Sequence, residues 1–167
     1  LTDRDKLMPT PGLMLYGQQV NAQHTIHFMV VNFNYGDWTL STAHSEGYSI
    51  VKTDQGFVRI KRALEIERQV LNYITDLGFT AAPGEKAGQQ ERVFFSEGKT
   101  IIESASRWRD FIQNTLPELE RKGWVIEIAD SFKLNFQTAQ NWDAKISESQ
   151  NDWFEMHFTV EIDNQSY

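Results

Sequence analysis

Residues 151–163 form the most regular stretch of the chain, with the sequence Asn-Asp-Trp-Phe-Glu-Met-His-Phe-Thr-Val-Glu-Ile-Asp. Between Phe154 and Ile162, apolar residues occupy every even-numbered position and polar residues occupy every odd-numbered one. Successive side chains of a β-strand point to opposite faces, so this two-residue period predicts a strand that is buried on one face only. The stretch therefore indicates a sheet that packs one face against the rest of the fold.

The polar face of this predicted strand carries Trp153 beside Glu155 and His157. An outward tryptophan is more often a packed surface residue than a ligand platform, but tryptophan is also enriched at protein interfaces. We therefore interpret Trp153, Glu155 and His157 as a candidate interface.

A helical period precedes this strand. Apolar residues recur at three- and four-residue spacings and form one stripe, which consists of Ala105, Trp108, Ile112, Leu116 and Leu119. Pro117 lies inside the pattern and cannot donate a backbone hydrogen bond to Gln113, so we expect the helix to kink or restart there. Gly123 and Trp124 then mark its end and the start of a strand over 125–128.

The N-terminal half is predicted to contain several short strands and one helix. Apolar alternation and turn residues predict strands over 13–20, 24–35, 38–40 and 48–52, with 56–60 leading into a helix over 62–78. The apolar parity changes within 24–35, so this strand is either covered on both faces or reset by a bulge near Met29 to Val31. The helix ends at Gly78, where a left-handed cap is expected.

Three further segments are assigned from turn residues and composition. Residues 1–11 are polar and contain two prolines, so they are expected to be irregular. Glu97-Gly98 is expected to be a hairpin turn between strands over 93–95 and 100–102. Proline and glycine residues suggest a linker over 83–90.

These elements predict an α+β fold with mostly antiparallel sheets and two main helices. The linker over 83–90 divides the chain into an N-terminal α+β half, 1–82, and a C-terminal α+β half, 91–167. Each helix ends in a glycine followed by an aromatic residue that starts a strand, which raises the hypothesis of two related halves. The alternative is that this arrangement is simply common chemistry at helix ends.

The composition limits the class of protein. Of 167 residues, 40% are hydrophobic and 23% are charged, which favours a packed core over disorder. No apolar run approaches the roughly 20 residues needed to cross a bilayer, so no membrane association is expected. Cysteine is absent, which fits the reducing cytoplasm. The net charge of −7 counts against a main duplex-binding surface, because nonspecific DNA affinity rests on cations that neutralise phosphates.

The second helix nevertheless contains a local group of cations. The candidate nucleic-acid patch consists of Arg107, Arg109, Arg121 and Lys122. Arg121 and Lys122 also have a simpler explanation, because cations near a helix C-terminus interact favourably with the helix dipole.

No catalytic, metal or cofactor site is predicted. Residues 98–100, Gly-Lys-Thr, resemble the end of a phosphate-binding loop, but the position that requires the first glycine is Val93. Such a loop also needs a helix to follow, whereas the two isoleucines after Thr100 favour a strand. His24 and His27 are three residues apart on a predicted strand and therefore point to opposite faces.

The order of motifs resembles the accessory region upstream of the motor in bacterial Swi/Snf-type ATP-dependent helicases. The resemblance rests on Leu116-Pro117-Glu118-Leu119, Gly123-Trp124, the strand over 125–128, Trp142, Asn151 to Phe154, and Val160 to Asp163. A looser match extends upstream through 9–13, 33–36 and 62–78. None of these motifs is catalytic, so the resemblance depends on their order and spacing.

The resemblance implies a non-catalytic accessory or regulatory domain of a DNA translocase, which docks on the parent's motor domains or recruits a partner. ATP and Mg²⁺ would belong to the parent motor, and this segment is expected to hold no cofactor. The alternative is a stand-alone protein- or ligand-binding module. The family's region continues beyond Asp163, so we expect this chain to be a piece of a longer protein. Its strand over 154–162 would then have an unpaired edge, and we expect the chain to dimerise through that edge.

Overall fold

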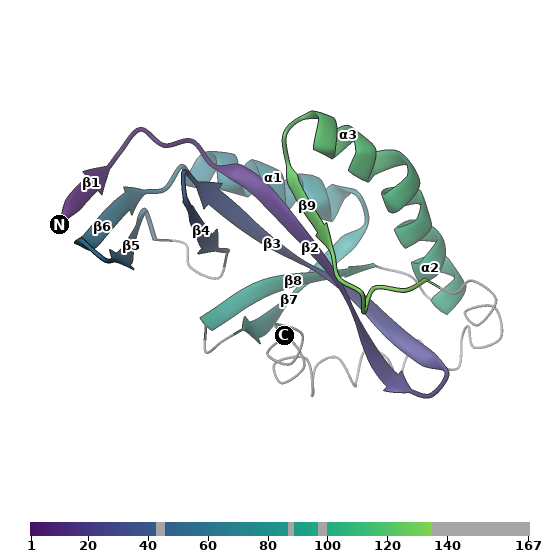
Figure 1. Ribbon diagram of the computed structural model, residues 1–167. Helices are drawn as coiled ribbons and strands as arrows, with labels where there is room; N and C mark the ends of the chain where they lie inside the picture. The colour runs from purple at the N-terminus through teal and green to yellow at the C-terminus, as the bar shows by residue number, and fades with distance from the viewer. Residues whose placement is uncertain (43–45, 87–88, 97–99, 135–167) are drawn as a thin grey trace.

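The computed structural model describes residues 1–42, 46–86, 89–96 and 100–134 and shows an α+β fold (Figure 1). The strands are β1 (Thr2–Arg4), β2 (Thr10–Asn21), β3 (His24–Tyr35), β4 (Trp38–Ser41), β5 (Tyr48–Thr53), β6 (Gly56–Lys61), β7 (Phe79–Lys86), β8 (Gln89–Ser96) and β9 (Val125–Ile128). The helices are α1 (Leu64–Asp76), α2 (Ile101–Asp110) and α3 (Leu116–Arg121), and a π-helical turn, η1 (Phe111–Thr115), joins the last two. Most strand pairs are antiparallel, and α2, η1 and α3 run on as a second main helix, so the predicted fold class is confirmed.

The larger sheet carries the core. Its strands follow the order β7-β8-β3-β2-β9, and β4 pairs with the end of β3. β9 runs parallel to β2, whereas the other pairs of this sheet are antiparallel. Both main helices pack on the same face of the sheet, where the buried residues include Leu13, Leu15, Met29, Val31, Phe33, Ile74, Phe79, Phe94, Trp108, Phe111, Leu116 and Leu119. Removing this apolar surface from water is the main stabilising contribution to the fold.

β3 is covered on both faces, which decides between the two alternatives that its sequence left open. Its odd-numbered residues from Met29 to Tyr35 join the main core, and its even-numbered residues from Ile26 to Val30 join a second cluster with Tyr16 and Val93. Pairing with β2 continues without interruption from Thr10↔Asn34 to Gln19↔Thr25, so no bulge resets the register in the middle of the strand. The change of apolar parity is therefore the pattern of a central strand with two packed faces.

The second helix restarts at its proline, as predicted. Pro117 lies in the first turn of α3, and the preceding turn, η1, is π-helical. Proline lacks a backbone N–H, and the wider π turn accommodates the missing hydrogen bond without ending the helix. The predicted apolar stripe is buried or packed against the core, and Trp108 at its centre is only 1% exposed.

The predicted strand over 100–102 is wrong, and with it the hairpin around Glu97-Gly98. α2 begins at Ile101, and Thr100 is its extended N-cap residue, with φ −133° and ψ 163°. The Thr100 hydroxyl accepts the backbone N–H of Glu103 at 3.1 Å. This cap outweighs the β-preference of the two isoleucines. The sequence signal was the Thr-x-x-Glu spacing of a capping box.

The stretch predicted as a linker, 83–90, is mostly paired strand, so that local prediction is wrong. β7 and β8 form a hairpin whose register runs from Phe79↔Ser96 to Lys86↔Gln89. Pro83 is tolerated there because, among the described strands, β7 has a neighbour on one side only. Strands from both sides of this hairpin share the larger sheet, although the division into halves 1–82 and 91–167 stays a prediction.

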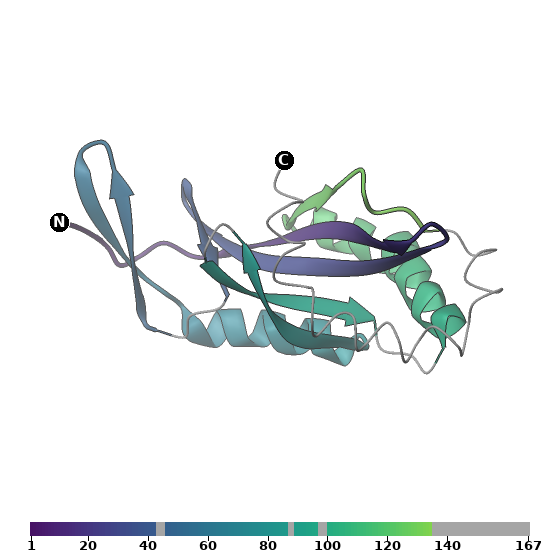
Figure 2. The same cartoon turned by 90° about the horizontal axis from the view of Figure 1, so that it is seen from below.

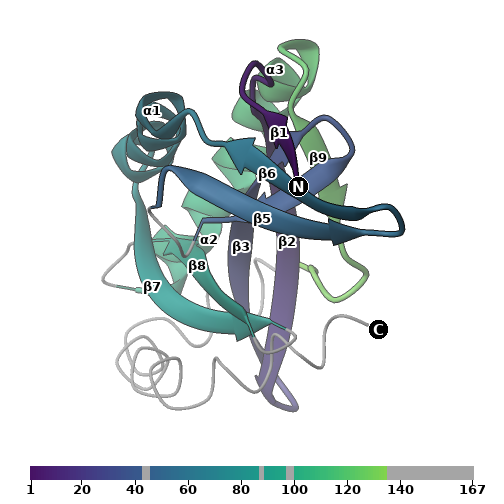
Figure 3. The ribbon, with the colours of Figure 1, turned by 90° about the vertical axis from the view of Figure 1, so that its left-hand side faces the viewer.

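The smaller sheet has the strand order β1-β6-β5. β5 and β6 form a hairpin around the turn at Asp54-Gln55, and β1 pairs with β6 in parallel. Residues 1–11 are therefore not irregular throughout, because β1 lies within them and β2 starts at Thr10. Figures 1 and 2 show this sheet at the end of the molecule that carries the N-terminus, opposite α2, and Figure 3 shows it from that end.

Both predicted glycine caps are confirmed. Gly78 follows α1 with φ 100°, Gly123 follows α3 with φ 95°, and each precedes a strand. The predicted strand over 154–162 and the dimer edge along it lie outside the described residues. Within the described chain, no helix has both the length and the apolar character needed to cross a membrane.

Candidate functional site

The outer face of the β5–β6 hairpin combines exposed apolar side chains with cations. Residues directly opposite one another in an antiparallel pair project from the same face of the sheet. Three such pairs lie along this face: Tyr48 with Lys61, Ile50 with Arg59, and Lys52 with Phe57. Each pair thus presents one apolar side chain and one cation, and these six residues are called the hairpin face below.

The apolar members of the hairpin face are open to solvent. Tyr48 is 47% exposed, Ile50 is 64% exposed and Phe57 is 53% exposed. Single apolar side chains are common on protein surfaces, whereas a contiguous group often marks an interaction site. The hairpin face is the best candidate for such a site because its apolar residues occupy neighbouring positions of one small sheet.

The hairpin is positive in an acidic chain. Residues 48–61 carry three cations, Lys52, Arg59 and Lys61, against one acid, Asp54, so their net charge is +2, whereas the whole chain has −7. Lys52 and Lys61 are exposed and have no ion pair with another described residue. These two lysines of the hairpin face are therefore available to an anionic partner.

Arg59 is the cation of the hairpin face with contacts inside the chain. Its Nε donates to the Asp3 carboxylate of β1 at 2.7 Å, and its guanidinium lies 5.1 Å from the centre of the Tyr48 ring. The side chains of the ion pair are 41% and 47% exposed, so water screens it and it contributes little to stability. These contacts orient Arg59 across the face without burying it.

The opposite face of the hairpin is anchored in the main core. Val58 and Ile60 of β6 are buried, and Val51 of β5 packs against the same cluster. The two-residue period therefore separates the hairpin into an anchored inner face and an open outer face. The sequence predicted a strand over 48–52 and a segment over 56–60 that leads into the helix, but not that the two pair, which the short turn between them could have indicated.

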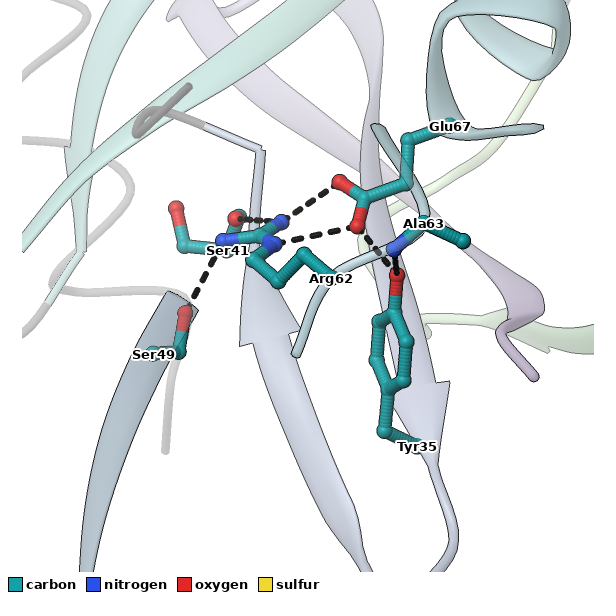
Figure 4. A network of polar contacts seen from close by, with 6 residues as sticks. All are labelled: Tyr35, Ser41, Ser49, Arg62, Ala63 and Glu67. Atoms are coloured by element: carbon teal, nitrogen blue, oxygen red, sulfur yellow. Dashed lines mark hydrogen bonds and ion pairs between the residues drawn. The ribbon is translucent and has the colours of Figure 1, made fainter. Parts of the chain in front are cut away.

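A buried polar network connects the hairpin to the larger sheet and to α1 (Figure 4). Arg62 directly follows β6, and its guanidinium makes a two-point contact with the Glu67 carboxylate: Nε lies 3.0 Å from Oε2, and Nη2 lies 2.6 Å from Oε1. The same guanidinium donates to the carbonyl oxygen of Ser41 at 2.8 Å and to the hydroxyl of Ser49 at 3.3 Å. Arg62 thus joins β4, β5 and α1 at one point.

Tyr35 extends this network to the end of β3. Its hydroxyl donates to the Glu67 carboxylate and accepts the backbone N–H of Ala63 at 2.9 Å. Burial of the phenol, together with its hydrogen bond to Glu67, raises the pKa of Tyr35 above its ordinary value. The side chains of Arg62 and Glu67 are 2% and 6% exposed, so every charge in the network depends on its partners. We interpret the Arg62–Glu67 network as a structural contact that holds the hairpin in place. The network could not be predicted from the sequence, because its members come from β3, β4, β5, α1 and the connection between β6 and α1.

The four cations predicted as a nucleic-acid patch are distributed along the second helix: Arg107, Arg109, Arg121 and Lys122. Arg107 packs over the turn after α1, where a Cβ added to Gly78 would lie 2.3 Å from its Nε. Arg121 forms an ion pair with Glu118 at 3.4 Å, and Arg109 and Lys122 are exposed. Acidic residues are interleaved with these cations on the same helix: Glu103, Asp110, Glu118 and Glu120. The positive charge is therefore diluted there, and nucleic-acid binding by this helix stays a prediction.

The other candidate interface, Trp153 with Glu155 and His157, lies outside the described residues. The predicted site residues that the structure does describe lie on or directly after the second helix, and none of these four belongs to β5 or β6.

The two histidines of β3 serve packing. His24 is buried, and burial lowers its pKa. His27 places Nε2 beside the carbonyl oxygen of Lys133 and its ring 4.9 Å from that of Phe132. Burial lowers the pKa of His27 to about 4. Across the described ranges, no group of three or more His, Asp or Glu residues is arranged to hold a metal ion.

The strand before the Gly-Lys-Thr sequence lacks the backbone arrangement of a phosphate loop. Val93, where that motif requires its first glycine, is fully buried in β8 and pairs with Val30 and Ala82. Its backbone is therefore engaged in the sheet and cannot wrap a phosphate. Gly98 and Lys99 lie outside the described residues.

Comparison with known proteins gives one match. The family model described as bacterial SNF2 helicase associated matches residues 21–165. No curated protein and no solved structure matches the chain.

Proposed function

We propose that this chain, which belongs to the bacterial SNF2 helicase-associated family, is a non-catalytic accessory domain that docks on the motor of its parent protein and regulates it. The observation that carries this proposal is the family match, which extends over both helices and most strands of the fold. The motifs that align the chain with this family contain no catalytic signature, so a regulatory or docking role fits them better than a reaction.

The chemistry of ATP is assigned to the motor in this proposal. ATP and Mg²⁺ would bind the motor domains, and the accessory domain would change how fast they turn over. The buried position of Val93 supports this division, because a phosphate loop that ends in Gly98-Lys99-Thr100 would need its first glycine there. The parent would then be an ATP-dependent translocase that acts on DNA.

We place the domain in the cytoplasm, together with such a motor. The absence of cysteine fits a reducing compartment, and the described helices include none that could span a bilayer.

The test uses the motor domains of the parent protein with and without this chain. DNA-stimulated ATP hydrolysis is measured for the full protein, for the motor alone, and for the motor after addition of the separate chain. We expect the full protein and the motor alone to differ in hydrolysis rate, and the added chain to restore part of the difference. Equal rates in all three samples, with no binding of the chain to the motor, would exclude the docking role.

A further inference from the structure

The hairpin face joins two features that seldom serve the same kind of partner. Each of its three apolar side chains, two of them aromatic, lies opposite a cation on the paired strand. Proteins that bind single-stranded nucleic acid without sequence preference combine the same two features, aromatic rings for base stacking and cations for the phosphates. We propose that the hairpin face binds single-stranded DNA, with bases on Tyr48 and Phe57 and phosphates on Lys52 and Lys61.

The geometry of the hairpin suits an extended strand. Residues that share a face of a strand are two apart, so successive pairs of the hairpin face are about 7 Å from one another along the strands. The apolar member lies on β5 in two of the three pairs and on β6 in the third. Each apolar side chain therefore has a cation directly across from it, which places a base-stacking position next to a phosphate-binding one.

The cations favour DNA over an apolar protein partner. A protein surface that covered Tyr48, Ile50 and Phe57 would also remove Lys52 and Lys61 from water, and an unpaired charge is expensive to bury. A single strand of DNA offers flat apolar bases and a charged backbone together, so it satisfies both halves of the face. A duplex keeps its bases stacked inside, and the net charge of −7 weakens its attraction to the chain as a whole.

The inner anchorage adds to this argument. Val58 and Ile60 hold the hairpin in the core, and the Arg62–Glu67 network holds the end of β6. The strands that present the outer side chains are thus fixed before a ligand arrives, so binding does not require the hairpin to become ordered. This inference goes beyond docking on the motor, and DNA binding can be measured on the chain alone.

The first experiment measures fluorescence anisotropy of a labelled oligo-deoxythymidine strand, about 16 nucleotides long, on addition of the 167-residue chain. We expect saturable binding that Tyr48→Ala and Phe57→Ala each weaken roughly 5- to 150-fold, the range for loss of one stacked base. Tyr48→Phe retains the ring and should bind like the parent chain. Thermal melting of each variant checks the fold, since these side chains are exposed. Absence of binding by the parent chain, or equal affinity of Tyr48→Ala and Tyr48→Phe, would overturn the proposal.

The second experiment identifies the cations from the salt dependence of binding. Arg59 is already paired with Asp3, so Lys52 and Lys61 together predict a slope of about −1.4 in log K against log salt concentration, because a single strand contributes about −0.7 per phosphate. Lys52→Gln and Lys61→Gln should each make the slope shallower by about 0.7. Lys122→Gln, which removes an exposed cation of the second helix, should leave it unchanged.

The Lys122→Gln control also distinguishes a DNA site on the hairpin face from one on the second helix. If Lys122→Gln reduces the slope while Lys52→Gln and Lys61→Gln do not, the DNA site lies on the second helix and the proposal is wrong. If the hairpin variants lose binding to the motor domains but the chain never binds DNA, the face is a protein contact. The proposed docking role would then survive, and this inference would not.

Discussion

The Arg62–Glu67 network provides the sharpest prediction about stability. Replacing Arg62 with Met removes both contacts to the Glu67 carboxylate and leaves that charge with the Tyr35 hydroxyl as its one remaining donor among the described contacts. The substitution also removes the hydrogen bonds to Ser41 and Ser49. Met fills much of the volume of the arginine stem, so the change mainly tests the charge.

The expected loss is large for a domain of this size. Removing one partner of a buried ion pair costs about 3–5 kcal/mol, because the other charge is left uncompensated. Domains are stable by about 5–15 kcal/mol, so Arg62→Met should remove about a fifth or more of the free energy of unfolding. The melting temperature should fall by roughly 6–20 °C, at about 2–4 °C per kcal/mol. The double variant Arg62→Met with Glu67→Leu should recover part of this loss, since it no longer buries an unpaired carboxylate.

Urea denaturation monitored by tryptophan fluorescence would measure these free energies. The control is Arg68→Met, which removes an arginine from an ion pair with Glu65 at 2.8 Å whose side chains are 64% and 69% exposed. That variant should lose less than about 1 kcal/mol. If Arg62→Met proves no more destabilising than Arg68→Met, the network does not hold the hairpin. Hydrogen exchange should also show faster opening of β5 and β6 than of β2 and β3 in the Arg62 variant.

Three further predictions follow from other parts of the chain. The pKa of His27 in the folded state is lowered to about 4, so its neutral form contributes its whole stabilisation above pH 6.5. The free energy of unfolding should then fall as the pH drops from 6.5 towards 4. In thermal melts at stepped pH, His27→Gln should reduce this decline. Gly78→Ala should destabilise the chain more than Gly47→Ala in urea denaturation, because Gly78 has φ 100° and a new Cβ there would meet the Arg107 side chain, whereas Gly47 has open space around it and no positive φ. Equal losses would contradict the left-handed cap after α1. In the strand predicted from sequence over 154–162, Phe158→Asp should lower the melting temperature far more than Thr159→Asp, since an unpaired carboxylate on the buried face costs several kcal/mol; similar melting temperatures would reverse the assigned faces.

Much of the local structure was accessible from the sequence. The bounds of β3, the glycine caps after α1 and α3, and the restart of the second helix at Pro117 all depend on neighbouring residues. The competing signals at Thr100 are also local: the two isoleucines after it favour a strand, whereas the Thr-x-x-Glu spacing favours a helix cap, and the cap forms. The error over 83–90 arose because proline and glycine mark irregular segments only on average, and an edge strand tolerates both.

The candidate site was much less accessible. The alternation of Tyr48, Ile50 and Lys52 was visible in the sequence, but its meaning depends on which face of β5 is buried. That face is determined by contacts of Val58 and Ile60 with a core built from distant strands and helices. A two-residue period separates the faces of a strand without saying which of them meets the core.

By itself, the sequence determined several strands of the N-terminal half, the two main helices, the glycines that end them, and the motifs that connect the chain with its family. These features depend on backbone preferences and hydrogen bonds within a few residues, which the order of amino acids specifies directly. Only the tertiary structure decided that β9 lies parallel to β2, that Arg62 meets Glu67 and Ser41, and that the hairpin face is open. Strand partners and buried charges are selected by the free energy of packing the whole chain, in which residues far apart in sequence compete for the same neighbours.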